Sequence, residues 1–169
     1  MTTYFAYGSN MLTNRLTRRA PGAATVGPAR LDGFRLSFHK CGVDGSGKCS
    51  IGPAPDERSS MWGVLFHVPY HEHILLDRAE SLGAGYFRRS VRVQHNNQTV
   101  TAWTYQAQSR FIDDSLAPFE WYHSLVLAGA HEHGLPHTYI ERIGSVASIV
   151  DPAVGRSAEM AALLPSPTP

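Results

Sequence analysis

The stretch that decides the fold lies near the start of the chain and reads YFAYGSNM from Tyr4 to Met11. Its apolar beginning predicts a buried strand. Gly8 then lets the backbone turn sharply, and Ser9 and Asn10 are residue types that commonly begin a helix. Backbone N–H groups at such a turn favour an anion, so the stretch predicts a cradle for a carboxylate. The simpler interpretation is an ordinary capped helix.

Strand patterns continue through the first two thirds of the chain. Alternating apolar residues predict a strand over 30–39, another over 61–68, and a hairpin of 87–95 and 99–106. The stretch 41–55 is rich in Gly, Ser and Pro and is predicted to be a loop with at most a short strand.

Helical spacing of apolar residues predicts helices after Met11, over 71–80, over 118–134, and from Pro136 onward. Strands followed by helices predict an α+β fold. The expected organisation is one domain over 1–150, followed by a poorly ordered tail over 151–169.

Composition and charge narrow the class of protein. The 169 residues are 43% hydrophobic and 17% charged, which is typical of a globular chain. The formal net charge of +1 gives no reason to expect nucleic acid as a partner. No stretch reads as a membrane span or a secretory signal, so we expect a cytoplasmic protein. Cys41 and Cys49 are the only cysteines, and whether they pair stays open.

Five stretches in this order resemble the γ-glutamylcyclotransferase family, which shares its fold with AIG2-like proteins. The resemblance runs from about Tyr4 to Val146. Besides YFAYGSNM, the stretches are 29–34, 62–64, Leu76-Asp77-Arg78-Ala79-Glu80 with Gly85-Tyr86 after it, and 122–143.

The resemblance implies a small mixed β-barrel with flanking helices and two helices near the C-terminus. It also implies a reaction that needs no cofactor. The α-amine of a γ-glutamyl substrate attacks its own γ-carbonyl, which yields 5-oxoproline and a free amine. No Ser or Cys nucleophile is then required of the protein.

The resemblance assigns roles to seven residues. Glu80 would act as general base and then general acid. The residues expected to bind the substrate are Tyr7, Gly8, Ser9, Asn10, Tyr86 and Tyr122. Leu82, Tyr86 and Phe87 are expected to wall the Glu80 side chain, and the stretch 41–55 is expected to line the leaving-group side.

Two other groups of polar residues are expected to be structural. Arg15, Arg18 and Arg19 read as the solvated face of a short helix. His131-Glu132-His133 with His137, and His71 with His73, resemble metal ligands, but side chains two apart on a helix do not share a face. We therefore expect no metal.

The sequence leaves several alternatives open. The amine could come from glutathione turnover, from breakdown of a γ-glutamyl isopeptide, or from a biosynthetic deprotection. A non-catalytic module that keeps the barrel and binds a ligand is the competing class, because fold does not fix function. The protein could be a monomer or a homodimer.

Overall fold

Five strands close into a barrel in the computed structural model, which describes residues 1–56 and 58–165. The barrel order is β1-β5-β2-β6-β7. These strands are β1 (Thr2–Ala6), β2 (Ala24–Asp32), β5 (Ser60–Val68), β6 (Tyr86–His95) and β7 (Gln98–Ala107). Most neighbours are antiparallel, and β1 closes the barrel by running parallel to β7. The predicted α+β fold with a mixed barrel is confirmed.

The expected hairpin is β6 and β7, which turn through Asn96 and Asn97 with positive φ angles. Asparagine tolerates this backbone conformation better than most residues. The strand expected over 30–39 is wrong in one respect. It is divided between β2 and β3 (Phe34–Cys41), because Gly33 takes a φ of +74° and turns the chain.

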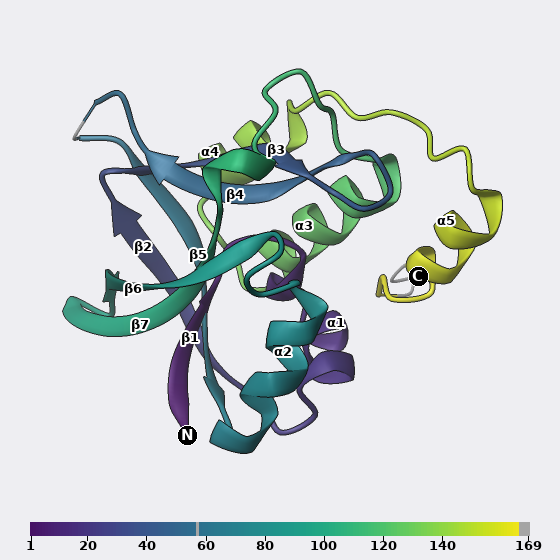
Figure 1. Ribbon diagram of the computed structural model, residues 1–169. Coiled ribbons are helices and arrows are strands. Elements are labelled where there is room, and N and C mark those ends of the chain that lie inside the picture. The colour runs from purple at the N-terminus through teal and green to yellow at the C-terminus, as the bar shows by residue number, and fades with distance from the viewer. Residues whose placement is uncertain (57, 166–169) are drawn as a thin grey trace.

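The stretch 41–55 contains a full strand, β4 (Gly47–Pro53), which pairs with β3 in a separate two-stranded sheet. The expected loop is therefore limited to the turn between the two strands. Periodicity missed β4 because its apolar residues are few. Figure 1 shows this β3–β4 hairpin lying across the upper end of the barrel. Its two cysteines, Cys41 and Cys49, are free thiols.

The helices pack outside the barrel. They are α1 (Thr13–Arg19), α2 (His73–Ala79), α3 (Glu120–Glu132), α4 (His137–Gly144) and α5 (Val154–Ala161), with 3-10 turns at Ser9–Met11, Tyr70–Glu72 and Ser109–Phe111. Helices α1 and α2 lie side by side on one flank (Figure 1). Among the described residues, none of these helices is long and apolar enough to cross a membrane.

The poorly ordered tail expected from residue 151 needs correction. Residues Val154–Ala161 form α5, which packs against α3. Leu163 is buried in a small cluster with Leu12 and Leu125. The sequence does not predict this cluster, because its three members come from distant parts of the chain. Residues 166–169 of the expected tail lie outside the described residues.

The barrel core fixes where the functional stretch emerges. Phe5 and Ala6 of β1 are fully buried and pair with Leu65 and Val64 of β5. Burying such side chains is the main source of folding free energy. The chain then leaves β1 at Tyr7, at the end of the barrel that the β3–β4 hairpin covers, and enters α1.

Candidate active site

A pocket of about 140 Å³ opens at this end of the barrel, between the loop after β1, the end of α2 and the β3–β4 hairpin. All seven residues expected in the site line it. The full lining is Tyr4, Tyr7, Gly8, Ser9, Asn10, Arg15, Arg19, Lys40, Gly42, Val43, Lys48, Cys49, Ala79, Glu80, Ser81, Tyr86, Tyr105 and Tyr122.

Glu80 is held by polar partners. It follows directly after α2, and its side chain is 17% exposed. Its Oε1 accepts a hydrogen bond from Arg19 Nη1 at 2.7 Å and another from Asn10 Nδ2 at 3.0 Å. Both donors hold the carboxylate in a fixed position.

The apolar wall expected around Glu80 is only partly present. Tyr86 lines the pocket, whereas Leu82 is 42% exposed and Phe87 is 39% exposed, and neither lines it. The residues after α2 turn back on themselves, with Ser81 and Gly83 at positive φ, before β6 begins at Tyr86. This turn brings Tyr86 to the pocket.

Asn10 connects the loop to the carboxylate. Its Nδ2 donates to Glu80 and also to the hydroxyl of Tyr4 at 3.1 Å, and its Oδ1 accepts from Arg19 at 2.9 Å. Both donor hydrogens of the amide are therefore used within the protein. The side chain of Asn10 acts by positioning Glu80 and Arg19.

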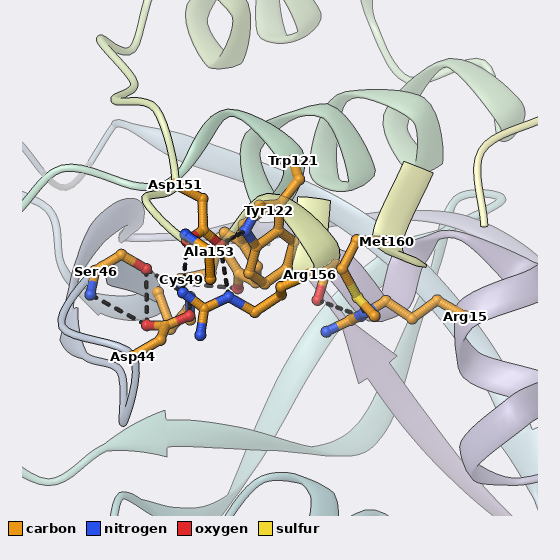
Figure 2. Close-up of polar contacts among 12 residues, drawn as sticks. Arg15, Asp44, Ser46, Cys49, Trp121, Tyr122, Asp151, Ala153, Arg156 and Met160 are labelled. Carbon is orange, nitrogen blue, oxygen red and sulfur yellow. Dashed lines mark hydrogen bonds and ion pairs between the residues drawn. The ribbon is translucent and has the colours of Figure 1, made fainter. Parts of the chain in front are cut away.

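Ser9 and Arg15 form a second polar pair on the pocket wall. Arg15 Nε donates to Ser9 Oγ at 2.9 Å, and Arg15 Nη1 lies 3.4 Å from the sulfur of Met160 (Figure 2). No carboxylate among the described residues forms an ion pair with Arg15. Burial lowers the pKa of Arg15 to about 10, so the guanidinium stays charged at neutral pH. A cation without an anionic partner is well suited to bind an anionic ligand.

The backbone of the loop makes a tight turn. Met11 N–H donates to Gly8 O at 2.9 Å, which is the first hydrogen bond of the 3-10 turn. The N–H groups of Ser9 and Asn10 precede it and have no partner within that turn. A side chain on Gly8 would place its Cβ 2.9 Å from Cys49 Cβ, so glycine is needed here for the approach of β4.

The three predicted tyrosines use their hydroxyls to hold the backbone. Tyr7 donates to the carbonyl of Tyr105, and Tyr86 donates to the carbonyl of Cys49 at 2.7 Å. Tyr122 accepts from the N–H of Cys49 at 3.0 Å. Burial raises the pKa of all three hydroxyls, which keeps them neutral. Their rings line the pocket while their hydroxyls fix β4 and β7.

The sequence did not predict that four basic residues line the pocket, namely Arg15, Arg19, Lys40 and Lys48. The two arginines are four residues apart, so they share one face of α1, and that face meets the pocket. This spacing was the available signal, and a solvated helix face was the wrong interpretation of it. Lys48 Nζ bonds to Asp44 at 2.7 Å and lies over the rings of Trp121 and Tyr122.

Two of the histidines considered as metal ligands make contacts that stabilise the fold. His133 Nε2 lies 2.9 Å from Met11 O, and His73 Nε2 lies 2.6 Å from Thr2 Oγ1. Over residues 1–56 and 58–165, no group of three His, Cys, Asp or Glu side chains lies close enough to hold a metal ion.

The C-terminal segment is fastened beside the pocket through Asp151. Its carboxylate accepts hydrogen bonds from Trp121 Nε1 at 2.6 Å, Ala153 N–H at 2.8 Å and Arg156 Nη2 at 2.6 Å (Figure 2). Hydrogen bonds from Arg156, and then those from Ala153 and Trp121, hold the pKa of Asp151 well below its usual range. Helix α5 is thereby placed so that Met160 reaches Arg15.

Comparison with known proteins agrees with this arrangement. Residues 60–143 match the AIG2-like family. The chain is 31% identical to gamma-glutamylcyclotransferase of Homo sapiens over 150 aligned residues, which cover 85% of this chain and 77% of the human protein. It is 30% identical to the gamma-glutamylcyclotransferase of Bos taurus over 151 residues, with the same coverage.

A solved structure of a gamma-glutamyl cyclotransferase superposes with a TM-score of 0.82 at 26% identity. It covers 95% of this chain and 98% of its own. The overall fold of this chain therefore recurs in that protein.

Proposed function

Because the chain belongs to the γ-glutamylcyclotransferase family and is an enzyme, we propose that it converts a γ-glutamyl amine or γ-glutamyl amino acid to 5-oxoproline and the free amine. Its homologues are enzymes, so a catalytic role takes the place of the non-catalytic module. The observation that carries the proposal is the contact of Glu80, the one carboxylate that lines the pocket among the described residues, with Asn10 of the substrate loop.

The proposed reaction is an intramolecular acyl transfer. Glu80 takes a proton from the α-ammonium of the substrate, and the freed amine attacks the γ-carbonyl carbon. A new C–N bond closes the five-membered ring, and the carbonyl oxygen becomes an oxyanion. Glu80 gives this proton to the leaving nitrogen, and the original amide bond breaks as the intermediate collapses. The ring nitrogen still holds one proton more than the lactam does, so Glu80 takes that proton as well and passes it to the released amine, which departs as an ammonium ion. One carboxylate thus serves as base and acid.

The protein contributes mainly by holding the substrate in this geometry. We assign the α-carboxylate of the glutamyl group to the N–H groups of the Gly8–Asn10 turn and to Arg15 beside Ser9. The tyrosines Tyr7, Tyr86 and Tyr122 wall the pocket. Orientation of this kind can supply about 7–11 kcal/mol of the barrier.

The test is to incubate the purified protein, without added metal or cofactor, with a panel of γ-glutamyl amino acids, γ-glutamyl amines and γ-glutamyl-lysine isopeptide. We expect 5-oxoproline from the wild type. Glu80→Gln should keep the fold and lower kcat by about 10²–10⁴-fold, the contribution of a general acid–base group. Glu141→Gln is the matched control, because Glu141 is exposed and does not line the pocket. Near-normal turnover by folded Glu80→Gln would contradict the assignment.

The same panel addresses the pathway. A preference for γ-glutamyl amino acids would place the enzyme in glutathione turnover, and a preference for the isopeptide in protein breakdown. A preference for a larger amine would indicate biosynthetic deprotection. We propose a cytoplasmic enzyme, monomeric or homodimeric, which agrees with the two free thiols.

A further inference from the structure

Lys40 presents its ammonium group to the pocket. The residue is 7% exposed, and its main chain is fixed by pairing with Lys48 in β4 and by a bridge to Ile112. Its Nζ lies 4.9 Å from the centroid of the Tyr86 ring. Within the described parts of the chain, no carboxylate lies within ion-pair distance of Nζ and no hydrogen bond satisfies it.

A cation that is partly removed from water costs free energy when it has no anion beside it, and two other basic residues of the pocket have such an anion. Lys48 is paired with Asp44 at 2.7 Å, and Arg19 is paired with Glu80 at 2.7 Å. Of the four basic residues that line the pocket, Arg15 and Lys40 lack such a partner among the described residues. Burial also lowers the pKa of Lys40, because the ammonium group loses contact with water and forms no ion pair in return.

The two unpaired cations belong to different walls of the pocket. Arg15 bonds to Ser9 and thus lies with the loop that we assign to the glutamyl carboxylate. Lys40 lies against the stretch that follows Glu80, because a Cβ on Gly85 would come within 3.1 Å of Lys40 Nζ and 3.6 Å of the Glu80 carbonyl oxygen. The leaving nitrogen must also approach Glu80 to receive its proton.

We propose that Lys40 binds a carboxylate on the leaving amine and so selects γ-glutamyl amino acids over γ-glutamyl amines that lack this group. The inference rests on the proposed cyclotransferase function. A γ-glutamyl amino acid brings two carboxylates, and the pocket offers one unpaired cation for each. In an α-amino acid the carboxylate is one carbon from the leaving nitrogen, which suits a cation on the wall that carries Glu80.

Two substrates that differ only in this carboxylate test the proposal, namely γ-glutamyl-alanine and γ-glutamyl-ethylamine. The wild type should prefer γ-glutamyl-alanine in kcat/KM. Lys40→Met should lower kcat/KM for γ-glutamyl-alanine by about 10- to 100-fold, as for the loss of a charged hydrogen bond. It should change the value for γ-glutamyl-ethylamine by less than about threefold, and Lys40→Arg should restore part of the preference.

Lys48→Met is the matched control, since Lys48 is the only other lysine and lines the same pocket with its charge already paired. It should lower the melting temperature, and any change in kcat/KM should be the same for both substrates. If instead Lys40→Met lowers kcat/KM equally for both substrates, the carboxylate it binds is that of the glutamyl group. Such a result, or a wild type without preference, overturns the proposal.

Binding without turnover separates this proposal from the proposed reaction. In the Glu80→Gln variant, calorimetry should give a lower Kd for γ-glutamyl-alanine than for γ-glutamyl-ethylamine. Adding Lys40→Met should abolish that difference. If the wild type forms no 5-oxoproline but this difference in Kd depends on Lys40, the reaction fails and the subsite stands. Equal Kd values, or no binding of either substrate at millimolar concentration, overturn the subsite.

Discussion

Arg19 and Glu80 stand 61 residues apart in the sequence and form an ion pair of 2.7 Å on the pocket wall, and each also bonds to the amide of Asn10. The triangle ties α1, the loop after β1 and the end of α2 together. It holds the Glu80 carboxylate in one orientation, because the arginine and the amide each donate a hydrogen bond to it from a fixed direction.

Removing the arginine should therefore slow the reaction more than it weakens substrate binding. We expect Arg19→Met to lower kcat by about 10- to 100-fold, with a smaller change in KM, because a charged hydrogen bond to the proton-transfer group is lost. Arg18→Met is the control, because Arg18 lies next along α1 and is exposed. Steady-state kinetics on both variants, with circular dichroism to verify folding, makes the comparison. An unchanged kcat would contradict a positioning role for Arg19.

The close approach of Gly8 to Cys49 predicts a specific coupling. Gly8→Ala should destabilise the fold by about 1–3 kcal/mol and raise KM, because the new Cβ would lie 2.9 Å from Cys49 Cβ and push β4 away from the loop. Adding Cys49→Gly should recover part of the free energy of unfolding, since it removes the colliding atom. Cys49→Ala keeps that atom and removes only the sulfur, which would lie 3.3 Å from the new Cβ, so it should recover less. Urea unfolding of the wild type, of Gly8→Ala and Cys49→Gly alone, and of the double variant gives the coupling energy, and purely additive effects would contradict the collision.

The Asp151 carboxylate predicts a pH-dependent stability. Hydrogen bonds from Arg156 hold its pKa below the usual value in the folded protein, so its contribution is present above pH about 3.9 and is lost as the pH falls further. Asp151→Asn should lower the melting temperature by several degrees at pH 7, and the gap to wild type should shrink below pH about 3.9. Asp32→Asn, in an exposed pair, should show almost no gap. A gap that is constant from pH 7 to pH 3 would contradict this account.

The barrel could be predicted from the sequence largely because several of its strands have residue patterns that are typical of strands. β1 is an apolar run, and β6 and β7 alternate around an asparagine turn, so local pattern and final structure agree. β4 and α5 could not be found in this way. The buried residues of β4 are mainly glycine, cysteine and serine, and α5 is short and held by Asp151.

The candidate site, like the fold, could be predicted only in part. The resemblance located Glu80 and the Gly8–Asn10 loop, and the structure brings these residues together in one pocket. It did not locate Arg19 or Lys40, because a basic residue on a short helix or beside a glycine-rich turn looks solvated. Their burial depends on how the β3–β4 hairpin and α1 close over the barrel end, which no local pattern encodes.

The β3–β4 hairpin has a practical consequence. Both lysines of the chain, Lys40 and Lys48, lie on it and line the pocket. A lysine-specific endoprotease therefore has only these two cleavage points, and both are held in strand pairing in the folded protein. The rate of such nicking measures how often the native hairpin opens, and any compound that fills the pocket should slow it. The rate of nicking, followed on a gel, therefore reports whether a compound occupies the pocket, and the measurement needs no substrate that turns over.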